Sequence, residues 1–276
     1  MNYYLLTILS SALSVSQSTC TKTASDAKRV ISFNTINFFT SSLLFALILT
    51  GSFTFHTPTL FYAILSGITL ALSTIFGHLA LTKGPMAVTS LICSYAIVIP
   101  SIFGISYLKE SVTYLKVLGF VLLVVSMYML SKRDSERSYK KGWFFCLIIA
   151  FVCNGITSVI QKLHQTDYNG LYLNEFTFFS FLSAFLILFI ITVFKKEKPN
   201  VKNIKFAIPA GIFLGSANFL TLFLSAKMDA SVLFPTTTVF KVMFVCLASR
   251  FFFKDKLTIK QFCGIVLGVI SVILIK

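Results

Sequence analysis

The sequence predicts an all-α integral membrane protein with ten transmembrane helices, arranged as two inverted five-helix repeats. Three observations support this prediction: an apolar composition, ten apolar segments of membrane-spanning length, and a similarity between the two halves of the chain. Of the 276 residues, 56% are hydrophobic and only 12% are charged, and the mean hydropathy is +0.86. A soluble domain of this size needs a more polar surface. We therefore expect the chain to lie in a bilayer.

The apolar segments are each about 18 to 24 residues long, the length that a helix needs to cross the ~30 Å hydrocarbon core. The predicted helices cover residues 2–23, 30–51, 59–82, 86–108, 113–131, 142–161, 173–194, 204–226, 230–253 and 257–275. No lysine or arginine precedes Lys22, so the first segment lacks the basic start of a signal peptide and is interpreted as a span. The charged linker 132–141 separates a first repeat, 1–131, from a second, 142–276.

The two halves resemble each other at offsets of 140 to 145 residues. The aligned pairs include Lys22 and Lys162, Asn34 and Asn174, Gly67 and Gly211, Lys109 and Lys254, and Gly119 and Gly264, with Glu110 opposite Asp255. Chance alignment of apolar helices would match Leu and Ile, but not Lys, Asn and Gly repeatedly. An odd number of spans in each repeat gives the two copies opposite orientations, which places a substrate site near the midplane.

Segments 80–130 and 224–275 are similar to the EamA-type repeats of the drug/metabolite transporter superfamily. The similarity depends on an acidic residue that closes the fourth span of each half (Glu110 and Asp255), followed by a polar turn and a glycine in the next helix (Gly119 and Gly264). It covers the whole chain as two five-helix copies. The resemblance implies a ten-helix carrier of small metabolites, without indicating which metabolite.

Lys241 lies near the middle of the apolar segment 234–256, where a lysine costs roughly 2.5 to 3.5 kcal/mol on insertion scales. Its stem cannot easily reach an interface ~15 Å away, so its ammonium is expected to face a polar interior. It suits the carboxylate or phosphate of a substrate, and the alternatives are a role in coupling or gating and an internal ion pair. Central Asp and Glu are absent, which argues against an exporter of hydrophobic cations built around a buried carboxylate.

Polar residues recur along one face of the first helix: Ser10, Ser14, Gln17 and Thr21. The aligned positions of the sixth helix are Ala150, Asn154, Thr157 and Gln161. Such side chains either line a cavity or hydrogen-bond between helices, and the long amides favour the cavity. The predicted substrate-binding residues are Lys241, Thr237, Thr238, Gln17, Ser14, Asn37, Thr74, Tyr95, Asn154, Thr157 and Asn218. The coupling candidates are Lys241, His78 and Glu175. His78 lies near a helix end, where a histidine is more often structural. Glu175 opens the seventh predicted span and is also placed to pair with a lysine.

Other classes of protein fit the sequence less well. The 24 basic residues are distributed between apolar blocks and give a net charge of +15 without a basic groove, so no nucleic-acid partner is expected. The six cysteines have neither disulfide nor metal-ligand spacing. The three histidines (His56, His78 and His164) lack catalytic motifs around them, so we expect neither an enzyme nor a cofactor or metal. Gly264 and Gly268 form a GxxxG motif, which favours close helix packing or a homodimer.

The leading hypothesis is a secondary active transporter that moves a small polar metabolite across the cytoplasmic membrane by alternating access. Amino acids and other carboxylates are the first choice, neutral sugars the second, and a cationic compound or a lipid-linked intermediate remains an alternative. A closed polar pocket favours the carrier, whereas an opening to the lipid favours a flippase. One set of loops carries 18 basic residues and the other five, so the positive-inside rule places both termini outside.

Overall fold

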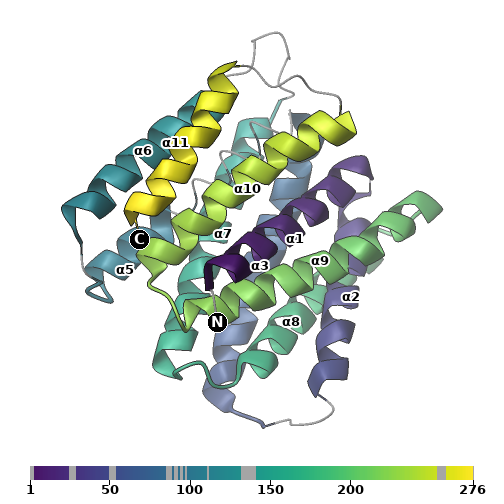
Figure 1. Cartoon of the computed structure of the whole chain (residues 1–276). Helices are drawn as coiled ribbons and strands as arrows, with labels where there is room; N and C mark the ends of the chain where they lie inside the picture. Colours follow the sequence, from purple (N-terminus) through teal and green to yellow (C-terminus); the bar gives the residue numbers. More distant parts are fainter. Residues whose placement is uncertain are drawn as a thin grey trace.

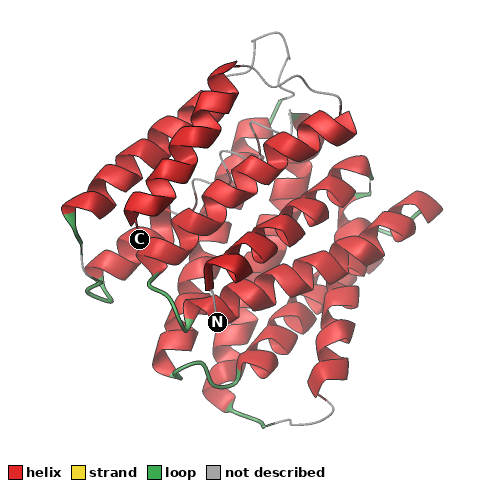
Figure 2. Cartoon of the chain, in the orientation of Figure 1, coloured by secondary structure: helices red, strands yellow, loops and turns green. Residues whose placement is uncertain are grey.

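The computed structural model describes residues 3–24, 29–49, 54–84, 89, 93, 96, 98–110, 112–131, 141–253 and 259–275. This part of the chain forms ten helices and no strand (Figure 2). The helices are α1 (Tyr3–Thr23), α2 (Val30–Leu49), α3 (Thr57–Lys83), α5 (Val98–Ser106), α6 (Tyr114–Ser131), α7 (Trp143–Asp167), α8 (Leu173–Phe194), α9 (Val201–Ser225), α10 (Ala230–Phe253) and α11 (Ile259–Ile275). The predicted all-α fold is confirmed. Tyr95, Asp255 and residues 132–140 of the predicted linker lie outside the described residues.

The helix boundaries differ from the prediction where polar side chains find partners. Helix α7 continues to Asp167 instead of residue 161 because its last turns bury polar residues, among them Lys162 and His164, that hydrogen-bond to other helices. Helix α9 begins three residues earlier than predicted because Asn200 caps it: the Asn200 side chain accepts a hydrogen bond from the Asn203 amide at 2.7 Å. Apolar length alone does not reveal these extensions.

The described helices have the distribution of side chains expected in lipid. Five of them, α2, α3, α7, α8 and α9, are long and apolar enough to cross a membrane, and α6 and α10 contain the shorter apolar stretches Tyr114–Ser126 and Ala230–Val245. Large apolar side chains such as Phe61 and Phe194 are 70% and 83% exposed, whereas the polar Asn34 side chain is completely buried. An apolar exterior around polar interior groups is stable in a bilayer rather than in water.

The helices pack around a central space. Helix α1 packs against α9 and α10, and α3 packs against α7 and α8 (Figure 1). Helix α2 contacts α8 and α9, while α6 and α11 lie side by side at one edge of the molecule, at the upper left of Figure 1. Buried phenylalanines, including Phe38, Phe45 and Phe181, fill the contact between α2 and α8. Helices α1, α3, α7, α9 and α10 line the central space.

Glycines bring several helices into backbone contact. A Cβ atom added to Gly67 of α3 would lie 2.6 Å from the carbonyl oxygen of Ser180 on α8, and one added to Gly211 of α9 would meet the carbonyl oxygen of Asn37 on α2. Such contacts leave no room for a side chain. The α3–α8 and α2–α9 contacts are therefore closely packed pairs.

The GxxxG motif of α11 packs within the chain. The Ser126 hydroxyl of α6 donates a hydrogen bond to the Gly264 carbonyl oxygen at 2.7 Å, and a Cβ atom on Gly268 would lie 2.9 Å from Ser126 Oγ. Both glycines are buried. Helix α6 covers this glycine face, so the face is not free to contact a second copy of the chain. A homodimer through Gly264 and Gly268 stays a prediction.

Candidate substrate cavity

A cavity of about 280 Å³ lies among α1, α3, α7, α9 and α10. This volume is at the lower end of the roughly 300 to 1,000 Å³ typical of ligand pockets, so it suits a small metabolite. The predicted binding residues in its wall are Ser14, Gln17, Thr74, Asn154, Thr157, Asn218, Thr237, Thr238 and Lys241, and the coupling candidate His78 also lines it. Most of the side chains that the sequence predicts to bind the substrate thus lie together in one cavity, and they come from five helices.

Two of the predicted site residues lie elsewhere. Asn37 is fully buried on α2, outside the cavity wall, and its side-chain amide has no hydrogen-bond partner among the described residues. Glu175, at the start of α8, accepts hydrogen bonds through Oε1 from the Thr54 amide at 3.2 Å and the Thr54 hydroxyl at 3.0 Å. Glu175 therefore holds the chain before α3, and it does not pair with a lysine in the described part of the chain. Tyr95, outside the described residues, is not placed.

The two polar stripes predicted from helical spacing reach the cavity. All four positions of the α7 stripe line it, and so do three of the α1 stripe: Ser14, Gln17 and Thr21. The exception is Ser10, whose hydroxyl donates a hydrogen bond to the Ala217 carbonyl oxygen of α9 at 3.2 Å. Ser10 is thus a contact between helices, the alternative that the sequence left open for such residues.

Lys241 contributes the only described cationic side chain in the cavity wall. It is half-buried on α10, and it makes no hydrogen bond or ion pair with a described residue. The described carboxylates have partners elsewhere, namely Glu110 at α10, Asp167 at Tyr62, Glu175 at Thr54, Glu197 at Ser32 and Asp229 at Lys116. None of these five carboxylates lines the cavity. The ammonium is therefore available to a ligand.

His78 lies in the cavity wall on α3 and is 2% exposed. Its Nδ1 is 3.4 Å from the Asn34 side-chain nitrogen, and the ring of Phe33 meets the imidazole edge-on with centroids 5.1 Å apart. Its Nε2 has no partner among the described residues. The packing of His78 against α2 favours a positioning role, and a role in coupling stays a prediction.

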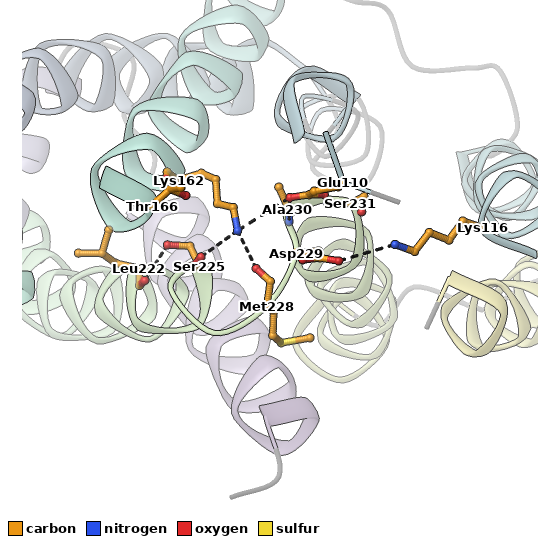
Figure 3. Close-up of polar contacts among 10 residues, drawn as sticks. All are labelled: Glu110, Lys116, Lys162, Thr166, Leu222, Ser225, Met228, Asp229, Ala230 and Ser231. Carbon is orange, nitrogen blue, oxygen red and sulfur yellow. Dashed lines mark hydrogen bonds and ion pairs between the residues drawn. The ribbon is translucent and has the colours of Figure 1, made fainter. Parts of the chain in front are cut away.

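A carboxylate from the first half of the chain holds the start of α10 in the second half. Glu110 follows α5, and its Oε1 and Oε2 accept hydrogen bonds from the amides of Ala230 and Ser231 at 2.8 and 2.9 Å (Figure 3). These amides belong to the first turn of α10, where the helix dipole favours a negative charge. Gly104 leaves room for the carboxylate, since a Cβ atom there would lie 2.7 Å from Glu110 Oε2.

Lys162 completes this arrangement, which we name the Glu110 clamp: Glu110, Lys162 and the first residues of α10. Lys162 Nζ lies 3.9 Å from Glu110 Oε1 and donates hydrogen bonds to the carbonyl oxygens of Ser225 at 3.0 Å and Met228 at 2.8 Å (Figure 3). Both Lys162 and Glu110 are largely buried. Lys162 follows the cavity residue Gln161 on α7, although neither Lys162 nor Glu110 lines the cavity.

Sequence reasoning missed the clamp and part of the cavity wall. Ser73, Ser158 and Thr221 line the cavity without having been predicted, although each lies next to, or one turn from, a predicted residue on the same helix. The repeat alignment paired Lys22 with Lys162, but the orientation count treated both lysines as loop charges. Nothing in the sequence indicated that Glu110 reaches across to α10, because that contact joins residues 120 positions apart.

Apolar helices around a polar cavity are a common arrangement in membrane transporters. Residues 141–276 match the model of the EamA-like transporter family. The chain is accordingly a member of this transporter family, within the drug/metabolite transporter superfamily. No curated protein sequence matches it. A solved structure titled "Crystal structure of protein" superposes with a TM-score of 0.77 at 13% sequence identity, covering 98% of this chain and 95% of that chain. This likeness establishes a shared fold.

Proposed function

We propose that the two halves are inverted repeats that rock against each other around the cavity. The pairing of helices supports this, because the repeat alignment makes α1, α2 and α3 equivalent to α7, α8 and α9. Helix α1 packs on α9, and its equivalent α7 packs on α3. In the same way α2 packs on α9, and its equivalent α8 packs on α3. A pair of polar contacts supports it too. Lys22 Nζ donates to the Leu81 carbonyl oxygen at 2.8 Å, and Lys162 Nζ donates to that of Ser225 at 3.0 Å. These four residues are matched by the repeat alignment, so the same contact occurs once in each half.

The function that follows is secondary active transport of a small polar metabolite carrying a carboxylate across the cytoplasmic membrane. The observation that carries this proposal is Lys241, a cation in the wall of a small cavity whose described residues supply no balancing acid. In a low-dielectric surrounding, an ammonium that lacks a partner is costly, and a substrate carboxylate relieves that cost. Alternating access by the two halves would then expose the loaded cavity to each side in turn.

Competing substrates fit the cavity less well. A cationic compound would meet the Lys241 ammonium without a carboxylate to offset the repulsion. A neutral sugar would hydrogen-bond to the hydroxyl and amide side chains but would leave the ammonium without a counter-charge. A lipid-linked intermediate needs more room than the cavity's volume of about 280 Å³ provides.

A ligand screen on the purified full chain tests this function. We expect amino acids or organic acids to raise the unfolding temperature in a concentration-dependent way, because a ligand that binds the native state alone stabilises it. Sugars and cations, measured at the same ionic strength, serve as the comparison. Stabilisation by sugars or cations together with none by carboxylates would refute the choice of substrate.

We also propose that both termini face the outside, since the loops on the other side of the predicted spans carry 18 of the basic residues. A reporter that is active only in the cytoplasm is expected to give no signal when fused to the C-terminus, and a strong signal when inserted between residues 132 and 141. A signal from the C-terminal fusion would reverse the orientation without affecting the cavity.

A further inference from the structure

Exposed lysines gather where α8 ends and α9 begins. We name this segment, residues 195–205, the basic turn, and its lysines are Lys195, Lys196, Lys198, Lys202 and Lys205. None of these side chains makes a hydrogen bond or an ion pair with a described residue. The acidic residue of the segment, Glu197, is used by a neighbouring helix: its Oε1 accepts a hydrogen bond from the Ser32 amide of α2 at 2.7 Å. The basic turn therefore presents an excess of positive charge to its surroundings.

Contacts with the start of α2 hold the basic turn in place. Before the Glu197 contact, the Thr192 hydroxyl of α8 lies 2.7 Å from the Thr35 hydroxyl of α2. After it, the side-chain amide of Asn203 donates a hydrogen bond to the Arg29 carbonyl oxygen at 3.4 Å, and Asn203 itself is buried. The lysines thus extend from a backbone that is fixed to a neighbouring part of the chain on both sides of the turn.

The local structure does not favour lysine at two of these positions. Lys196 has a backbone φ of +50°, a left-handed conformation that glycine adopts more easily. It ends α8 in a Schellman motif, in which the amides of Lys196 and Glu197 donate to the carbonyl oxygens of Val193 and Thr192 at 3.1 and 3.2 Å. Lys202 lies in the first turn of α9, where the helix dipole disfavours a cation. The charges of Lys196 and Lys202 are therefore not explained by the stability of the turn itself.

Apolar side chains lie beside the lysines on both helices. Phe194, the last residue of α8, is 83% exposed, and Val201, the first residue of α9, is 82% exposed. Apolar side chains that are exposed at the end of a membrane span contact lipid. Lysines next to such side chains suit an amphiphile in which an anionic headgroup is joined to acyl chains.

We propose that the basic turn binds the phosphate headgroup of an anionic phospholipid. The lysine ammonium groups donate charge-assisted hydrogen bonds to the phosphate, while Phe194 and Val201 contact the acyl chains. Clusters of about four to eight basic residues directly after a membrane span are typical of anionic lipid recognition. The opposite end of α8 differs in character: residues 168–172, which connect it to α7, contain no charged side chain. Lipid binding is thus assigned to one end of α8.

A lipid titration of the purified full chain in a neutral detergent tests the proposal. Phosphatidylglycerol is the probe, phosphatidylcholine with the same acyl chains is the comparison, and native mass spectrometry gives the dissociation constant of the first bound lipid. We expect phosphatidylglycerol to bind about tenfold more tightly or better, and this preference to shrink as salt is added, because the charges are exposed. Glycerol 3-phosphate, which has the anionic group without acyl chains, should not displace phosphatidylglycerol.

Matched double variants link the preference to the basic turn. Lys198→Gln with Lys202→Gln should raise the dissociation constant of phosphatidylglycerol by about 25-fold, since each lysine beside an anionic lipid contributes roughly fivefold. The control, Lys109→Gln with Lys227→Gln, removes two exposed lysines that lie close to the start of α10 in the sequence or through the Glu110 contact. We expect this control to bind phosphatidylglycerol as the unaltered protein does, and both variants to bind phosphatidylcholine normally.

Lys196→Gly separates lipid binding from a structural role. Glycine suits the left-handed backbone at this position, so the unfolding temperature in neutral detergent should stay the same or rise. The dissociation constant of phosphatidylglycerol should nevertheless increase by about fivefold, because one ammonium is lost. A lysine that served the fold alone would show no change in lipid binding.

Any of three results would overturn the inference. Equal binding of phosphatidylglycerol and phosphatidylcholine by the unaltered protein would show that the headgroup charge is not recognised. Equal weakening in the two double variants would show that net charge, and not the basic turn, decides the affinity. Displacement by glycerol 3-phosphate would assign the turn to a free phosphate compound instead of a lipid. Each result leaves carboxylate transport intact, because no residue of the basic turn lines the cavity.

Discussion

Replacement of Lys241 by glutamine is expected to weaken carboxylate binding by about 100-fold and to abolish uptake into proteoliposomes. The cavity offers no other described cation, so a carboxylate bound to the variant loses its counter-charge. Truncating one partner of a buried charge pair costs about 2 to 5 kcal/mol, which corresponds to roughly 30-fold or more in affinity. The measurements are the dissociation constant of the best ligand from the screen and its initial rate of uptake.

Two further variants make this prediction specific. Lys241→Arg keeps the charge and should retain part of the binding, although the larger guanidinium fits the same space differently. Lys227→Gln removes an exposed lysine in the turn between α9 and α10, outside the cavity wall, and should leave binding unchanged. Normal uptake by a well-folded Lys241→Gln protein would show that the ammonium does not contact the substrate.

The second large effect is expected at the Glu110 clamp: Glu110→Ala should lower the free energy of unfolding by about 3 kcal/mol. The substitution removes two charge-assisted hydrogen bonds to the start of α10 and leaves Lys162 without its carboxylate. Removing one partner of a buried pair costs roughly 3 to 5 kcal/mol, because the remaining charge stays buried. The free energy can be measured by reversible denaturation in one detergent, or compared through the unfolding temperature.

A weaker pair on the same turn provides the control. Asp229 lies 3.8 Å from Lys116 Nζ, and its side chain is 54% exposed. Asp229→Asn should therefore change the stability by less than about 1 kcal/mol. We also expect Lys162→Met to recover part of the loss in a Glu110→Ala background, since the two changes share one interaction. Equal destabilisation by Asp229→Asn and Glu110→Ala would mean that the clamp contributes no more than an exposed ion pair.

Much of the fold was predictable because a bilayer imposes simple rules on sequence. Apolar length located the helices, and α8 and α10 begin and end where predicted. These rules fail at helix ends, where a hydrogen-bond partner decides the boundary. The contacts of Lys162 and His164 lengthen α7 at its C-terminal end, and the Asn200 cap lengthens α9 at its N-terminal end. Such partners come from distant parts of the chain and leave no local pattern.

The cavity was predictable in part because polar and charged side chains within a membrane span are costly unless they face a polar interior. Helical spacing identified Gln17 and Thr157 as members of polar stripes, and the cost of a central charge identified Lys241. Asn37 was indistinguishable from these residues by type and depth, yet it faces a helix contact instead of the cavity. Only the rotation of α2 about its axis separates the two cases, and that rotation depends on its contacts with α8 and α9.

Pro235 lies in α10 between the clamped first turn and Lys241. Proline has no amide hydrogen, so the backbone hydrogen bond that would reach back to the Ser231 carbonyl is missing, and a helix bends readily at such a gap. The first turn is tethered to the opposite half by Glu110, and the segment beyond it contains the cation. Helix α10 therefore lacks one backbone hydrogen bond between the turn that Glu110 holds and the lysine that lines the cavity.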